Sequence, residues 1–236
     1  MGLPLPERGP AMAGWSGELV LLRHAQTSCT VNGLFCGEHD PPLSPVGRLM
    51  SDTLSDADGL KGTSRLYISP SCRSVQTSAA LAARFGLVAR VEPRLRELSF
   101  GRWESRRPDQ VRFEQAYRRW YRDPARCAPP EGETGLAVLA RAVAAATEAL
   151  TLDGRFDGAK VALLTHKAPV RLLICHFLGL PPRQYRRIAP VPVCSVTRIR
   201  FDSGRPRLIE LGNVDHLPQR WRSAPDDAFD SSTENI

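Results

Sequence analysis

Short apolar runs alternate along the chain with longer segments of helical character. The runs predict four buried strands, at residues 18–22, 66–69, 88–91 and 161–165. Between or after them, apolar stripes and helix-forming composition predict helices at residues 44–60, 71–85, 108–123, 133–152 and 169–178. A late antiparallel pair is predicted at residues 195–201 and 206–211. Strands that alternate with helices predict a three-layer α/β/α sandwich with a mostly parallel sheet.

Capping residues support the predicted helix boundaries. Ser44 precedes Pro45, which suits the first turn of a helix, and Gly86 follows the helix expected at residues 71–85. The segment 108–123 has aromatic and small residues at helical spacing. These predict one buried face made of Phe113, Ala116, Tyr117, Trp120 and Tyr121.

The composition is that of a globular protein with a sizeable core. Of 236 residues, 42% are hydrophobic, and no apolar run approaches the roughly 18–20 residues that span a bilayer. The six cysteines lack metal-ligand spacing and the start lacks a secretory pattern, so free thiols and a cytoplasmic location are predicted. Residues 1–17 are predicted to form a flexible leader, and the acidic residues 223–236 a disordered tail.

The net charge of +7 favours an anionic partner, whether nucleic acid, acidic lipid or a phosphorylated metabolite. The most arginine-rich stretch, residues 102–126, also contains four acidic residues and has no nucleic-acid motif. A solvated helix face or a cap over an anionic substrate explains it better. We therefore expect a small phosphorylated metabolite as the partner, with no nucleic acid and no membrane. A homodimer remains an alternative to a monomer.

Basic residues and histidines follow the predicted strands at the points where the strands end. Arg23 and His24 follow the first strand, Arg73 lies just beyond the second, and His166 follows the fourth. Glu97 lies in a loop after the third strand. Ligands of open α/β sheets bind beyond the carboxyl ends of the strands, and a helix N-terminus near an arginine favours an anion. The pattern predicts an anion pocket with a nucleophile and a proton donor, as phosphoryl transfer requires.

Five motifs in this order resemble the histidine phosphatase superfamily, which has the phosphoglycerate-mutase-like fold. They are Arg-His-Ala at 23–25, Ser-Pro-x-x-Arg-x-x-Gln-Thr at 69–77, Leu-x-Glu-x-x-Phe-Gly-x-Trp-Glu at 95–104, Pro-x-Gly-Glu-Thr at 130–134 and Thr-His-Lys-x-x-x-Arg at 165–171. The resemblance covers about residues 18–212, and its 95–104 segment resembles the phosphatase branch. It implies a catalytic domain at 18–222 with a cap insert at about 102–134, and metal-independent chemistry without a cofactor.

The resemblance also implies roles for individual residues. His24 would be the nucleophile that becomes phosphohistidine, and Glu97 would protonate the leaving oxygen and then activate water. Three residues would hold the phosphoryl group, namely Arg23, Arg73 and His166. Three more are expected nearby: Thr30 at the phosphate, and Lys167 and Arg102 at the rest of the substrate.

The sequence departs from the family pattern at four positions, which are Ala25, Thr30, Glu38 and Lys167. Alanine replaces the usual glycine after the nucleophile and would be strained there if the site required a positive φ. Lysine replaces the glycine after the second histidine. The predicted function is that of a phosphomonoesterase acting through phosphohistidine. The alternatives are a phosphomutase or phosphotransferase on the same fold, or a catalytically decayed phosphate-binding protein.

Overall fold

A computed structural model describes residues 5–6, 9, 11–12, 14–152, 155–188 and 190–222. Its centre is a six-stranded sheet in the order β3-β2-β6-β1-β7-β8. The strands are β1 (Gly17–Arg23), β2 (Arg65–Ile68), β3 (Ala89–Val91), β6 (Lys160–Thr165), β7 (Val196–Asp202) and β8 (Arg205–Asn213). The four strands from β3 to β1 pair in parallel, and β7 and β8 join antiparallel. The predicted mostly parallel sheet is confirmed.

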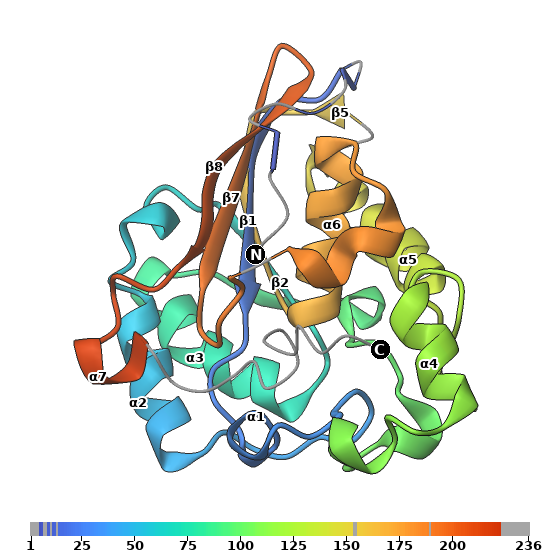
Figure 1. The fold of residues 1–236 in the computed structure, drawn as a ribbon. Coiled ribbons are helices and arrows are strands. Elements are labelled where there is room, and N and C mark those ends of the chain that lie inside the picture. Colours follow the sequence, from blue (N-terminus) through green and yellow to red (C-terminus); the bar gives the residue numbers. More distant parts are fainter. Residues whose placement is uncertain are drawn as a thin grey trace.

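Helices cover both faces of this sheet, as Figure 1 shows. On one side lie α2 (Pro45–Leu54) and α3 (Cys72–Phe85), and on the other α5 (Gly135–Ala149) and α6 (Lys167–Leu178). Successive residues of β1 point to opposite faces, so Leu19 and Leu21 join one apolar cluster while Val20 and Leu22 join the other. A strand buried on both faces reads as a continuous apolar run, which is why the sequence predicted it.

Shorter elements complete the chain. They are α1 (Ser28–Asn32), α4 (Gln115–Arg122), α7 (Gln219–Arg222), the strand pair β4 (Thr151–Leu152) and β5 (Arg155–Phe156), and 3-10 turns at Asp58–Leu60, Pro93–Leu95, Gly101–Trp103, Pro108–Gln110 and Pro182–Arg187. Within the described residues, none of the helices combines the length and apolarity that crossing a membrane requires.

Three predicted helices are shorter than the sequence suggested. Residues 44–60 form α2 and then a 3-10 turn, and the end of 133–152 turns into β4. Residues 108–123 form a 3-10 turn and then α4, which starts only at Gln115. Because the helix is interrupted before Gln115, Phe113 falls off its buried face and is 72% exposed. The other aromatic residues of this segment do form an apolar cluster, with Phe35 and Trp103.

Several described residues of the segment 1–17, which the sequence predicts to be a flexible leader, contact the rest of the domain. The N–H of Gly9 donates to Pro206 O at 2.8 Å, and that of Met12 to Gly204 O at 2.6 Å. Trp15 packs against the rings of Phe156, Phe177 and Phe201, with ring centroids 4.6–5.4 Å away. Burying a large indole explains why this segment lies on the domain. The predicted tail at 223–236 lies outside the described residues.

Candidate active site

A cavity lies at the carboxyl edge of the parallel strands. Arg23 and His24 reach it from the end of β1, Arg73 from the start of α3, and Lys167 from the start of α6. Aromatic side chains form another part of its wall, namely Phe35, Phe100, Trp120 and Tyr185. The structure thus brings together residues that the sequence placed at separate strand ends.

A hydrogen bond to the backbone fixes the orientation and the tautomer of the His24 ring. Its Nδ1 lies 2.8 Å from the carbonyl oxygen of Ala25, so Nδ1 carries the proton and donates it, and Nε2 keeps its lone pair. Burial, together with the positive charges of Arg73 and Arg23, holds the pKa of His24 well below its usual value. A neutral imidazole with a fixed tautomer is suited to nucleophilic attack through Nε2.

Ala25, which replaces the family's usual glycine, is accommodated without strain. It does not adopt a positive φ, and its side chain is fully buried in the apolar cluster on the α2–α3 side. Its N–H donates to Thr77 Oγ1 at 3.0 Å. The expected penalty of an alanine at this position is therefore absent.

His166 lies between Arg73 and Ser69. Arg73 Nε donates to His166 Nδ1 at 3.3 Å, and His166 Nε2 lies 2.8 Å from Ser69 Oγ. Because Nδ1 accepts, the proton is on Nε2. Burial and the nearby charge of Arg73 lower the pKa of His166 well below its usual value. This histidine is therefore also neutral before an anion binds.

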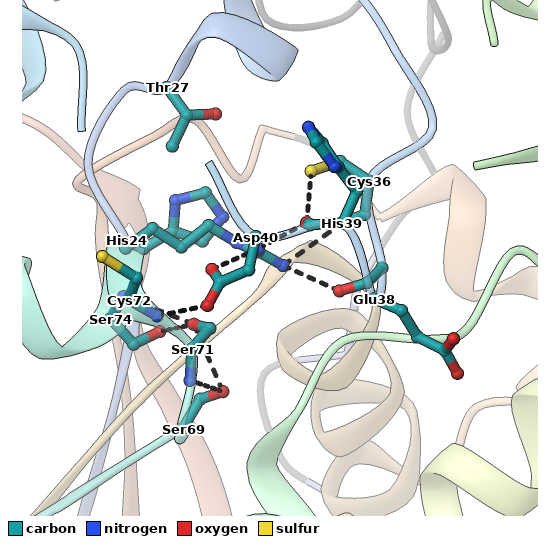
Figure 2. A network of polar contacts seen from close by, with 12 residues as sticks. His24, Thr27, Cys36, Glu38, His39, Asp40, Ser69, Ser71, Cys72 and Ser74 are labelled. Carbon is teal, nitrogen blue, oxygen red and sulfur yellow. Dashed lines mark hydrogen bonds and ion pairs between the residues drawn. The ribbon is translucent and has the colours of Figure 1, made fainter. Parts of the chain in front are cut away.

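The Arg73 guanidinium is held by a loop and a carboxylate. It donates to the carbonyl oxygens of Cys36, Gly37 and His39 at 3.0–3.3 Å. It also pairs with Asp40 at 3.0 Å, while the other oxygen of Asp40 accepts from the Cys72 N–H at 2.6 Å. Figure 2 shows Asp40 between Cys72 and the loop residues. Arg73 is therefore fixed from the side of residues 36–40.

Glu97 is a buried carboxyl beside the first turn of α6. One of its oxygens accepts from the Leu98 N–H at 2.9 Å, and the Ala168 N–H lies 3.3 Å from the same oxygen. Burial raises the pKa of Glu97, although these hydrogen bonds and the charges of Arg73 and Arg23 oppose the change. A carboxyl with a raised pKa at the edge of an anion pocket can donate a proton.

The structure places two of the three residues predicted near the phosphate or the rest of the substrate at the cavity, and the third away from it. Lys167 and Thr30 both line the cavity. The Thr30 hydroxyl, however, donates to Thr27 O and accepts from Thr27 N, both at 2.9 Å, in the cap of α1. Arg102 is not among the residues lining this cavity. Its side chain is 69% exposed and pairs with Glu131, since the turn at Gly101–Trp103 points it outward.

Two arginines of the cavity wall have no role predicted from the sequence. Arg171 lies one turn along α6 from Lys167, within the last of the five motifs. Arg186 comes from the turn after α6, with its guanidinium 4.5 Å from the ring centroid of Trp120 and 4.7 Å from that of Tyr121. No local signal marks Arg186, because its position depends on how that turn packs against α4.

Arginines, the neutral His24 and a protonatable carboxyl line one cavity, which are the groups that phosphoryl transfer requires. His166 is not among the lining residues and lies behind them, with its ring centroid 5.1 Å from that of His24. The positive side chains can neutralise the charge on the phosphoryl oxygens, and Nε2 of His24 has a lone pair for attack on phosphorus. The carboxyl of Glu97 can protonate the leaving group. Comparison with known proteins agrees. A model of the histidine phosphatase superfamily (branch 1) matches residues 19–214, so the chain belongs to that superfamily.

Similar proteins carry names of phosphatases and mutases. Glucosyl-3-phosphoglycerate phosphatase of Mycobacterium tuberculosis is 29% identical over 187 residues, covering 77% of this chain and 84% of that protein. The probable phosphoglycerate mutase GpmB of Yersinia enterocolitica is also 29% identical, and the match covers 78% of this chain and 85% of that protein. The solved mycobacterial glucosyl-3-phosphoglycerate phosphatase with VO3 has a TM-score of 0.76 at 28% identity, covering 84% and 100% of the two chains. Family, fold class and phosphatase class are confirmed.

Proposed function

We propose that this protein hydrolyses a small phosphorylated metabolite through a phosphohistidine at His24, without a metal ion. The observation that carries the proposal is the fixed, neutral imidazole of His24. Its Nδ1–H is bonded to Ala25 O, so Nε2 is the nitrogen available to phosphorus. Sequence motifs alone left the tautomer and the protonation state open.

The reaction then has two displacements. In the first, Nε2 of His24 forms a bond to phosphorus, the ester P–O bond breaks, and Glu97 gives its proton to the leaving oxygen. In the second, Glu97 removes a proton from water, whose oxygen displaces His24 and forms inorganic phosphate. Arg23, Arg73 and His166 stabilise the phosphoryl charge. The two long contacts of Arg73, both 3.3 Å, are those that a phosphoryl oxygen would share.

We further propose that the leaving group carries a second anionic group. Lys167, Arg171 and Arg186 line the cavity in addition to the phosphate-binding arginines, whereas among the described residues Glu97 is the one acidic residue that lines it. Positive side chains from several elements of the wall favour a substrate with more than one anionic group. The relatives named for phosphoglycerates support the idea, since a glycerate has a carboxylate. The aromatic wall would contact the remainder of the substrate.

A phosphomutase is the second candidate, favoured by the relatives named as probable phosphoglycerate mutases. It would share the phosphohistidine step and differ in the acceptor of the phosphoryl group. A cytoplasmic location and a homodimer stay predictions.

The test is turnover of a panel of phosphorylated metabolites in the presence of EDTA, with released phosphate and positional isomers both quantified. Release of phosphate at a rate unaffected by EDTA supports the proposal. Isomerised ester without phosphate release supports the mutase instead. No turnover of any compound, despite phosphate binding, supports a decayed phosphate-binding protein.

A further inference from the structure

The carboxylate of Glu104 accepts hydrogen bonds from the backbone of three consecutive residues. Its two oxygens accept from the N–H groups of Gly37 at 3.0 and 3.1 Å, Glu38 at 3.1 Å and His39 at 3.2 Å. One of them also accepts from the Phe100 N–H at 2.9 Å. Hydrogen bonds to an ionised acceptor are stronger than neutral ones, so Glu104 fixes this loop to the segment that follows β3.

The same loop holds Arg73 from its other side. The guanidinium donates to Cys36 O at 3.3 Å and to Gly37 O at 3.1 Å. The Cys36–Gly37 and Gly37–Glu38 peptide groups therefore each direct a carbonyl at Arg73 and an N–H at Glu104. Both peptide dipoles are aligned between a negative and a positive side chain, an arrangement in which hydrogen bonds strengthen one another.

Gly37 allows these two peptide groups to lie between Glu104 and Arg73. A Cβ at that position would lie 2.1 Å from Leu98 O and 2.7 Å from a carboxylate oxygen of Glu104. Any side chain would push the two peptide groups away from the carboxylate. The close approach of Glu104 to the loop thus depends on a residue without a side chain.

We propose that Glu104 is a positioning residue that orients Arg73 for the phosphoryl group through the peptide groups of residues 36–38; this rests on the proposed function. Glu104 is not among the residues that line the cavity, so it acts through Arg73 rather than on the substrate. Without its charge, the N–H groups of Gly37, Glu38 and His39 lose their ionised acceptor, and the loop carbonyls no longer hold the guanidinium in one orientation. Affinity for a phosphoryl group then falls.

The experiment compares Glu104→Gln with Glu114→Gln by measuring the Kd of inorganic phosphate calorimetrically, together with each melting temperature. Glu114 is a matched control, because its carboxylate accepts from Trp103 Nε1 at 2.8 Å and Arg106 at 2.9 Å without contacting residues 36–40. We expect Glu104→Gln to weaken phosphate binding about tenfold or more, since hydrogen bonds to charged groups are lost. Glu114→Gln should leave Kd within about twofold while lowering the melting temperature to a similar extent.

The same substitution in an Arg73→Lys background separates positioning from general destabilisation. Lysine cannot make the planar set of contacts with the loop, so Glu104→Gln should there change Kd by less than about twofold. An undiminished effect in that background, or equal effects of Glu104→Gln and Glu114→Gln in the parent, overturns the inference alone. A parent protein that binds no phosphate overturns the proposed function and this inference with it.

Discussion

The imidazole rings of His24 and His166 lie edge to face, with centroids 5.1 Å apart and an interplanar angle of 61°. Both are buried beside Arg73, which together with the burial lowers the pKa of each histidine well below 6.5. Two neutral rings in contact leave the positive charge of the site to the arginines and Lys167. Protonation of either ring in the empty site would add a like charge to those already present.

The first prediction follows from these lowered pKa values. Below pH 6.5 the unfolded chain binds protons at both histidines while the folded protein does not, so stability must fall as pH falls. Replacing His24 by Asn removes one such group. The loss of unfolding free energy between pH 6.5 and 5.5, measured by urea denaturation, should shrink by up to about 1 kcal/mol. An unchanged pH dependence would mean that His24 titrates normally.

Glu97→Gln should separate substrates by their leaving groups. A poor alcohol leaving group needs the proton of Glu97, whereas nitrophenolate leaves without one. We expect kcat to fall much more for an alkyl phosphate than for p-nitrophenyl phosphate. Because burial raises the pKa of Glu97, the parent's alkyl phosphate turnover should persist above pH 4.5 and fall as pH rises through the raised pKa. Equal losses on both substrates would contradict a role as general acid.

Lys167→Gly should change affinity for the substrate rather than the chemical step. 3-Phosphoglycerate has a carboxylate where glycerol 3-phosphate has a hydroxymethyl group. The two compounds therefore form a matched pair that differs in one anionic group. We expect KM for 3-phosphoglycerate to rise tenfold or more at low salt, as one charge-assisted contact of about 1.5–3 kcal/mol predicts. Turnover of glycerol 3-phosphate should stay within a few-fold of the parent. A large drop in kcat on both would place Lys167 in the chemical step.

A prediction for the fold concerns Glu18 in the central strand β1. Burial alone would raise its pKa, but hydrogen bonds from Arg198, Arg200 and Lys160 lower the pKa of Glu18 to about 2. A depressed pKa stabilises the folded protein above pH 4.5, and this contribution is lost as pH falls toward 2. Glu18→Gln should therefore lower the unfolding free energy at pH 7 by about 2–3 kcal/mol, measured by urea denaturation.

Glu210 provides the control for that measurement. It lies 3.8 Å from Arg198, but burial raises its pKa, so its charge does not stabilise the fold in the same way. Glu210→Gln should cause no comparable loss. Equal losses from both substitutions at pH 7 would contradict the assigned role of the Glu18 cluster.

Local signals were enough to predict the strand ends and the residues that follow them. His24 and His166 lie beyond continuous apolar runs, and such runs mark strands buried on both faces. The late β7–β8 pair was predicted instead from two segments joined across residues 202–205, and the structure pairs them antiparallel. Parallel pairing then brings the ends of β1 and β6 together, so the two histidines meet although the chain separates them widely.

Long-range packing set the features that the sequence did not predict. Helical periodicity put Phe113 on a buried face, but the turn before Gln115 breaks that periodicity. Arg102 and Arg186 are both arginines in polar segments. Only the packing of the Pro182–Arg187 turn on α4 brings Arg186, and not Arg102, to the cavity.

The most direct test of the central claim is to trap the phosphoenzyme. The protein is mixed with radiolabelled phosphomonoester, quenched in base within milliseconds, digested, and the labelled peptide is sequenced by mass spectrometry. The account predicts a base-stable, acid-labile phosphate on His24 that forms and decays at rates compatible with kcat, and that His24→Ala neither forms it nor turns over substrate while retaining its fold. Label on another residue, or full turnover by folded His24→Ala, would contradict the account.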